Sequence, residues 1–145
     1  MAGDFMRASG AGAVARRGIM ANPVRLAWSL GTWDSVARND GALLYAANFS
    51  IGMNLFYRIV DFAAHIFDKF EDYEPYVFEH HHSGKADAPS GTALQLAGIV
   101  RDRLERKSAL ALERLNRKLE SHEIGVAVVR AGGQPGEHVV GFDGP

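Results

Sequence analysis

The sequence Glu-His-His-His-Ser-Gly-Lys-Ala-Asp-Ala-Pro-Ser-Gly-Thr-Ala occupies residues 79–93 and joins a predicted strand, a polar loop and the start of a predicted helix. Imidazoles exchange protons near neutral pH, and lysine supplies a point charge for an anion. Backbone N–H groups at a helix N-terminus also bind anions. The stretch therefore combines a proton donor, a cation and an anion cradle, which indicates chemistry on a small carboxylated or phosphorylated molecule.

The segments around this stretch predict an α+β domain. Apolar residues at three- and four-residue spacing predict an amphipathic helix of about five turns, capped by Ser50 and with one core face. They are Met53, Phe56, Ile59, Val60, Ala63, Phe67 and Phe70. A second helix is expected from Ser90 or Thr92 to about Glu120, where recurring leucines supply apolar positions and the mixed charges of residues 101–118 are typical of a solvated helix face.

The strands are expected to form one mixed four-stranded sheet covered by the two helices on one side. Short apolar or alternating runs predict strands near 42–48, 73–80, 123–131 and 137–143. The last two flank a Gly-rich turn at residues 132–136, which predicts a hairpin. Residues 1–24 show no clean periodicity, and we interpret them as a flexible tail, although Gly10, Gly12 and Ala15 superficially match a dinucleotide fingerprint. A short strand is expected at 24–30 and a short helix at 34–39.

Composition narrows the class of protein. The 145 residues are 47% hydrophobic, carry a formal net charge of −1 and include no cysteine. Such a chain can bury a core and has no disulfide or Cys-based zinc site. The net charge near zero gives no electrostatic argument for binding to nucleic acid. No apolar run reaches the roughly 20 residues of a membrane span. Without a signal-peptide core at its N-terminus, the chain is expected in the cytoplasm, with no membrane partner.

The loop itself predicts a carboxylate site and no metal. In an extended strand, His80 and His82 point to one face and His81 to the other, so the three imidazoles do not converge on one ion. Gly91 permits close backbone approach, and the hydroxyls of Ser90 and Thr92, with nearby N–H groups, can hold a carboxylate. Lys85 completes the charge balance.

Three segments, in order, resemble the dihydrodipicolinate reductase family, also called 4-hydroxy-tetrahydrodipicolinate reductase. Residues 79–93 match its Glu-x-His-His-x-x-Lys-x-Asp-Ala-Pro-Ser-Gly-Thr-Ala motif. Residues 47–54 resemble its Asn-Phe-Ser-x-Gly-x-Asn segment, and residues 130–138 resemble its Arg-x-Gly-x-x-x-Gly-Glu-His segment. The similarity extends from about Gly31 to Pro145.

The resemblance implies reduction of a cyclic dicarboxylate by NADH or NADPH, in the diaminopimelate route to lysine. His81 would be the general acid, Lys85 would hold or polarise the substrate with His82 beside it, and Gly91 and Thr92 would bind a carboxylate. The nicotinamide side would comprise Gly31, Thr32, Ala46, Ala47 and Phe49. Family members assemble tetramers through the sheet, so a homotetramer is expected.

The sequence departs from the family at both ends. Residues 1–40 are expected to be a tail and a truncated remnant of the dinucleotide-binding domain, and residues 41–145 the substrate-binding, catalytic and oligomerisation domain. Most dinucleotide affinity comes from pyrophosphate and ribose contacts on the Rossmann half, so we expect weak cofactor binding. Ser83 and Gly84 also replace larger, often basic residues of the family. Two interpretations stay open: a reductase or its catalytic domain, and a non-catalytic remnant that retains the substrate pocket and the oligomer interface.

Overall fold

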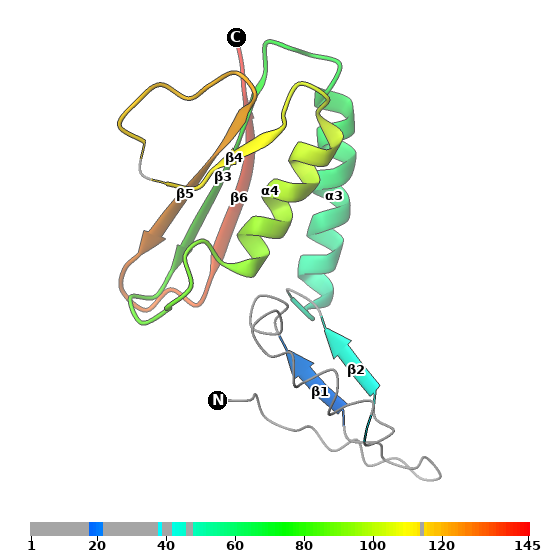
Figure 1. Ribbon diagram of the computed structural model, residues 1–145, viewed down its shortest axis with the longest axis vertical. Coiled ribbons are helices and arrows are strands. Elements are labelled where there is room, and N and C mark those ends of the chain that lie inside the picture. The colour runs from blue at the N-terminus through cyan, green and yellow to red at the C-terminus, as the bar shows by residue number, and fades with distance from the viewer. Residues whose placement is uncertain (1–17, 22–37, 39–41, 46–47, 114) are drawn as a thin grey trace. The chain divides into compact units, whose positions relative to one another are not determined.

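In the computed structural model, the chain from Ser50 to Pro145 folds into a four-stranded mixed sheet with two helices on one face (Figure 1). The structure describes residues 18–21, 38, 42–45, 48–113 and 115–145. The elements of this unit are α3 (Ile51–Phe67), β3 (Glu74–His81), α4 (Gly91–Arg103), β4 (Ala109–Ala111), β5 (Glu123–Arg130) and β6 (Glu137–Asp143). No helix among the described residues is long and apolar enough to cross a membrane.

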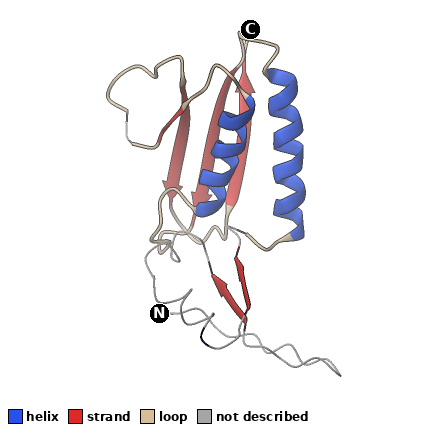
Figure 2. Cartoon of the chain, turned by 45° about the vertical axis from the view of Figure 1, so that its right-hand side comes forward, coloured by secondary structure: helices blue, strands red, loops and turns tan. Residues whose placement is uncertain are grey.

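The sheet has the strand order β4-β5-β3-β6. Strands β4, β5 and β3 run parallel, and β6 runs antiparallel to β3. The predicted α+β class, with a mixed four-stranded sheet covered by two helices, is confirmed (Figure 2). Because β3 is central and pairs on both sides, its C-terminal end meets side chains from both neighbouring strands.

Alternation along β3 separates a helix-covered face from an open face. Pro75, Val77, Glu79 and His81 are buried, whereas the residues between them are exposed or half-buried. Leu96 and Val100 of α4 are fully buried in the same core as Val77, and each such side chain contributes about 1.5–3 kcal/mol by leaving water. Phe67 of α3 stacks on Phe142 of β6 at 4.3 Å between ring centroids, which anchors α3 to the edge of the sheet.

Helix α3 begins at the predicted cap, since the Ser50 hydroxyl accepts a hydrogen bond from the Met53 N–H. Its single predicted core face is only partly correct. Val60 is buried, but Ile59 is 63% exposed and belongs to a second apolar stripe that α3 presents to solvent. Phe70, expected in the core, lies beyond the helix and is also exposed.

Helix α4 ends at Arg103, not near Glu120 as predicted. The backbone turns extended at Leu104, whose side chain is completely buried. Lys107 is also buried, and its ammonium donates to the Ser121 carbonyl and to the Glu74 carboxylate. The charged sequence has the composition of a solvated helix, but burial of these two side chains outweighs that local preference. The chain instead forms β4, the fourth strand of the sheet.

The strand predicted near 42–48 exists, but it does not belong to the four-stranded sheet. It is β2 (Ala42–Tyr45), which pairs in parallel with β1 (Gly18–Ala21) inside the separate unit Met1–Phe49. Residues 1–24, which were expected to form a flexible tail, therefore contain strand β1 near their end. The predicted strand at 24–30 and nearly all of the helix at 34–39 lie outside the described residues, except Arg38, which is helical.

The hairpin predicted from residues 123–142 is wrong in its pairing. β5 and β6 lie on opposite sides of β3 and make no ladder with each other. The connection between them crosses the end of β3, where the His82 N–H donates to the Gln134 carbonyl at 2.7 Å and the Ser83 N–H donates to Gly132 at 3.2 Å. The turn signal at residues 132–136 was correct, but it cannot reveal that a third strand inserts between its two arms.

The ion pair of Glu123 with Arg117 predicts an acid-sensitive contribution to stability. Hydrogen bonds from the Arg117 guanidinium and the Glu120 N–H lower the pKa of Glu123 from 4.5 to about 2. A lowered folded-state pKa stabilises the fold above about pH 4.5, and this contribution disappears as the pH falls toward 2. Urea unfolding should therefore show Glu123→Gln less stable than the parent chain at pH 7, with the difference shrinking below pH 4.5. The exposed Glu71→Gln serves as control, and a pH-independent difference for Glu123→Gln would contradict the assignment.

Candidate functional site

The register of the sheet brings four polar side chains together at the C-terminal end of β3. Glu79 lies directly opposite His138 of β6, and His81 lies directly opposite Arg130 of β5. Directly opposed residues in neighbouring strands have neighbouring side chains. Both pairs face the helices, because Glu79 and His81 are buried in the helix-covered pattern of β3.

The Glu79 carboxylate is fully buried and is held by two different segments. Its Oε1 accepts the Ser90 N–H at 2.9 Å and the Arg130 guanidinium at 2.6 Å. Burial favours a higher pKa, but the hydrogen bonds from Ser90 and Arg130 outweigh it and hold the pKa of Glu79 below its usual range. The carboxylate is therefore an anion, and it joins the start of α4 to the end of β5.

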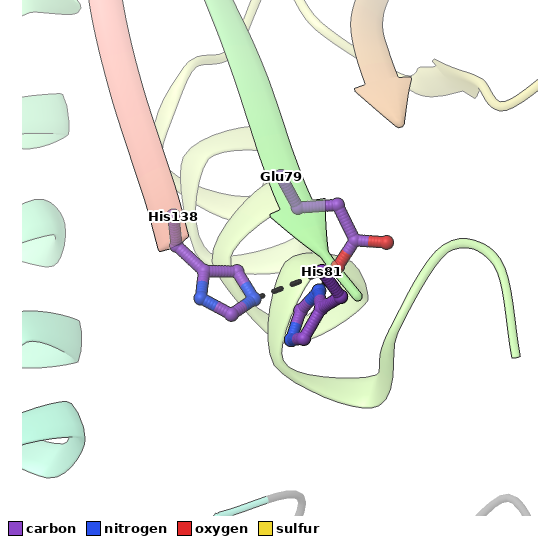
Figure 3. Close-up of side chains that lie close together, drawn as sticks. All are labelled: Glu79, His81 and His138. Atoms are coloured by element: carbon purple, nitrogen blue, oxygen red, sulfur yellow. Dashed lines mark ion pairs between the residues drawn. The ribbon is translucent and has the colours of Figure 1, made fainter. Parts of the chain in front are cut away.

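The other oxygen of Glu79 faces two imidazoles (Figure 3). Oε2 lies 3.5 Å from Nδ1 of His81 and 3.5 Å from Nε2 of His138. These separations are too long for good hydrogen bonds, and Oε2 and the His81 Nδ1 are buried without a partner. Unpartnered buried polar atoms cost about 1–3 kcal/mol each. A bound group that pairs with these atoms would therefore remove this free-energy cost.

Both imidazoles favour the neutral form. Burial lowers the pKa of His81, and the cations Lys85 and Arg130 lower it further against the opposing effect of Glu79. Burial also lowers the pKa of His138, with His81 as the next cause, and again Glu79 opposes the shift. The rings lie 5.1 Å apart in an edge-to-face arrangement. A proton or another cation at either ring therefore disfavours charge on its neighbour.

The second edge of His81 lies against the β5–β6 connection. A Cβ at Gly136 would come 2.9 Å from Nε2 and 3.2 Å from Cδ2 of this ring. The Ala131 N–H also donates to the His81 carbonyl at 3.0 Å. The imidazole is thus fixed with Nδ1 toward Glu79 and Nε2 toward a glycine that leaves it room.

The loop between β3 and α4 contributes a balanced set of charges. Lys85 Nζ donates to the Asp87 carboxylate at 2.7 Å, and Arg130 donates to the Asp87 carbonyl at 2.5 Å. Desolvation favours a higher pKa for Asp87, but the hydrogen bond and charge of Lys85, together with the charge of Arg130, outweigh it and lower the pKa of Asp87. Lys85 also depresses the pKa of both His81 and His138, so its ammonium lies within electrostatic reach of the site.

The first turn of α4 closes the site. The Ser90 hydroxyl accepts the Ala93 N–H at 3.1 Å as the helix cap and lies 3.2 Å from Nε2 of His138. The Thr92 side chain is buried. Burial raises the pKa of Tyr57 on α3, and a hydrogen bond with the Thr92 side chain partly offsets that increase. The two hydroxyls predicted to hold a carboxylate therefore differ: Ser90 belongs to the buried cluster and Thr92 faces the junction with α3.

Comparison with known proteins identifies the family. The family model described as "Dihydrodipicolinate reductase, C-terminus" matches residues 52–145, which include every residue of the cluster. The chain belongs to this family.

Two curated relatives agree with this assignment. The 4-hydroxy-tetrahydrodipicolinate reductases of Laribacter hongkongensis and Chromobacterium violaceum are 38% and 36% identical over 113 and 104 residues. These alignments cover 75% and 69% of this chain but only 42% and 38% of the relatives, so the chain spans about two fifths of their length. Among solved structures, the dipicolinate-bound dihydrodipicolinate reductase of Paenisporosarcina sp. TG-14 is 27% identical, with a TM-score of 0.48, and the match covers 74% of this chain and 40% of that one.

The structure brings only some of the predicted residues of the dihydrodipicolinate reductase site together. His81 and Ser90 lie in the buried cluster, and Lys85 lies in the loop beside it. Gly91 begins α4 at the edge of the cluster. His82 is exposed at the start of the loop. On the cofactor side, Phe49 is 40% exposed, and the remaining predicted residues, Gly31, Thr32, Ala46 and Ala47, lie outside the described residues.

Three residues of the cluster carried no predicted role: Glu79, Arg130 and His138. Each stands inside one of the segments that resemble the family, so the signal was present. Glu79 precedes His81 by two positions, which places both on one face of a strand. Arg130 and His138 could be connected to them only through the sheet register, since both belong to segments distant in sequence.

The contact between Gly136 and His81 predicts that a single methyl group disturbs the site. Gly136→Ala should destabilise the chain by about 1–3 kcal/mol, because the ring or the connection must shift. Gly133→Ala in the same connection is the matched control, since its Cβ meets nothing within 4 Å. Chemical denaturation measures the stability of both variants, and imidazole NMR signals report the His81 environment. Equal stability and unchanged signals in Gly136→Ala would disprove the contact.

Proposed function

We propose that this chain provides the substrate-binding and proton-donating part of a 4-hydroxy-tetrahydrodipicolinate reductase. The observation that carries the proposal is His81, whose ring is fixed between Glu79 and Gly136 beside Lys85 and the start of α4. An acid, a cation and helix N–H groups within one site suit a small dicarboxylate. The family and the relatives' names support the proposed reaction class, reduction of a cyclic dicarboxylate.

In this proposal, Nε2 of His81 donates a proton to the substrate ring, because Nδ1 faces the Glu79 carboxylate. Lys85 attracts one substrate carboxylate and exchanges its contact with Asp87 for it. The N-terminal turn of α4, with Ser90, Gly91 and Thr92, receives the other carboxylate. His82, exposed at the loop start, contacts the substrate from the solvent side.

NADH or NADPH would supply the hydride when bound. The parallel pair β1 and β2 fits the architecture of dinucleotide-binding folds, in which parallel strands form the sheet. Phe49 offers an exposed aromatic surface against which a nicotinamide ring can pack. We assign Gly31, Thr32, Ala46 and Ala47 to the same side by family resemblance.

A second candidate is a binding module that retains the substrate pocket without turnover. The observation favouring it is that the chain spans about two fifths of the reductases it matches. Both candidates share the site, and they differ in whether a bound cofactor completes the reaction. We further propose a homotetramer, cytoplasmic like other enzymes of amino-acid biosynthesis, with neither nucleic acid nor membrane as a partner.

The oligomer is proposed to form through the open face of the sheet. Phe78 of β3 pairs with Ala127 and Val139 on that face, and Val139 is 37% exposed. Tyr76, 44% exposed, lies between Gly125 and Gly141, where its ring takes the space that a side chain at Gly141 would need. An exposed apolar face of this kind is typical of a protein–protein interface.

The acid role of His81 predicts a defect in turnover. With saturating NADH or NADPH and substrate, His81→Gln should lower kcat by about 10²–10⁴-fold while changing KM little, because general acid catalysis contributes that much. His65→Gln, on the exposed side of α3, should keep the parent activity. An active parent chain with an equally active His81→Gln variant would exclude the acid role.

Direct binding separates the two candidate functions. If the parent chain shows no turnover with either cofactor, calorimetry with dipicolinate tests the pocket. Binding that is lost in Lys85→Ala would then favour the binding module. A parent chain that neither turns over substrate nor binds dipicolinate would refute both candidates.

The proposed interface predicts a tetramer that depends on Val139. Val139→Asp places a charge on the apolar face, where like charges of neighbouring copies would repel and desolvation would cost free energy. Size-exclusion chromatography with light scattering should show a tetramer for the parent chain and a smaller species for this variant. Gln95→Asp, on the exposed surface of α4, should remain tetrameric. A monomeric parent chain, or a tetrameric Val139→Asp, would rule out this interface.

A further inference from the structure

Three donor atoms of the cluster converge on one point. Oε2 of Glu79, Nδ1 of His81 and Nε2 of His138 all lie within 4.8 Å of one another (Figure 3). The carboxylate oxygen is 3.5 Å from each imidazole nitrogen. Ligands bound tetrahedrally to zinc at about 2.0–2.2 Å lie about 3.3–3.6 Å from one another. The two measured separations therefore match the edges of a zinc coordination tetrahedron better than they match hydrogen bonds.

The donors are buried and two of them lack partners. Glu79 is fully buried, and the His81 and His138 side chains are only 9% and 10% exposed. Neither Oε2 of Glu79 nor Nδ1 of His81 has a hydrogen-bond partner. Folding leaves such atoms unpaired only at a strained or functional position, or where a ligand belongs. The orphan atoms are aimed at each other and at His138, so they indicate one ligand between them.

We propose that Glu79, His81 and His138 form a binding site for a divalent transition-metal ion, with Zn²⁺ as the best match. Two imidazoles and one carboxylate are an established three-ligand set for zinc that leaves one coordination position open. Neutral imidazoles and an ionised carboxylate are also the forms that metal binding requires. The sequence did not predict this site, because His138 joins Glu79 and His81 only through the register of the sheet. Of the three consecutive histidines, His80 faces the other side of the sheet.

The surroundings hold the ligands in place. Oε1 of Glu79 accepts hydrogen bonds from Ser90 and Arg130, which fixes the plane of the carboxylate, as outer partners of metal ligands commonly do. Two cations, Lys85 and Arg130, also face the cluster, and they are balanced by Asp87 and Glu79. An ion bound here therefore adds net positive charge, which favours an anion at the open position.

Metal binding and the proposed acid role of His81 exclude each other. A metal on Nδ1 adds positive charge to the ring and prevents its uptake of a second proton. Zn²⁺ bound to the substrate-free chain would therefore inhibit the proposed reductase. The metal site itself does not rest on the proposed function, because it is defined by the three donors alone.

Calorimetry of the full chain with zinc sulfate, in a buffer free of chelators, tests the site. One equivalent of Zn²⁺ should bind per chain, and His138→Gln should weaken binding by more than about tenfold, since loss of an outer partner alone costs that much. His65→Gln is the matched control and should bind as the parent does. Because His138 lies outside the proposed acid and anion-binding groups, failure of zinc binding would leave the reductase proposal intact.

Spectroscopy on the unmodified chain guards against a variant that does not fold. Imidazole NMR signals of His81 and His138 should shift on addition of zinc, while those of His65 and His122 stay unchanged. Co²⁺ in place of zinc should give the visible absorption of a four-coordinate site. Absence of binding, or shifts confined to the half-buried His80 and the exposed His82, would overturn the proposal, as would a His138→Gln variant that binds zinc like the parent chain.

Discussion

The buried Glu79 carboxylate is the constraint on which the rest of the site depends. A charge removed from water must be paired and hydrogen-bonded within the protein. Glu79 obtains these partners from two places, the Ser90 N–H at the start of α4 and the Arg130 guanidinium at the end of β5. Its other oxygen, which has no hydrogen-bond partner, faces the imidazoles of β3 and β6. Satisfying one anion therefore fixes where the loop turns, where α4 begins and how the strand ends align.

Strand order makes this convergence possible. β3 has a parallel neighbour on one side and an antiparallel neighbour on the other. The C-terminal end of β5 and the N-terminal end of β6 therefore meet at the C-terminal end of β3. The short connection between β5 and β6 crosses that end and places Gly136 against His81. A hairpin of β5 and β6, as their sequence suggested, would have put His138 far from Glu79.

Local features were predictable from the sequence, and long-range pairing was not. The Ser50 cap, the strand at 74–81 and the alternation of His80 and His81 follow from side-chain chemistry and backbone period. The early end of α4 does not, because it depends on burial of Leu104 and on the pairing of Lys107 with Glu74, contacts made only in the folded chain. His81, Lys85 and Ser90 could be proposed from the sequence, because they lie in one contiguous motif. Glu79, Arg130 and His138 needed the register of the sheet to be joined to them.

The charge balance of the site bears on both occupants proposed for the cluster, a proton on His81 and a metal ion. Glu79 and Asp87 offset Lys85 and Arg130, so the free site is nearly neutral when both imidazoles are uncharged. A dicarboxylate binding at Lys85 and the start of α4 would add two negative charges, and a proton on His81 would compensate part of them. In this proposal a bound dicarboxylate would favour protonation of His81, which would link substrate binding to the loading of the proposed acid.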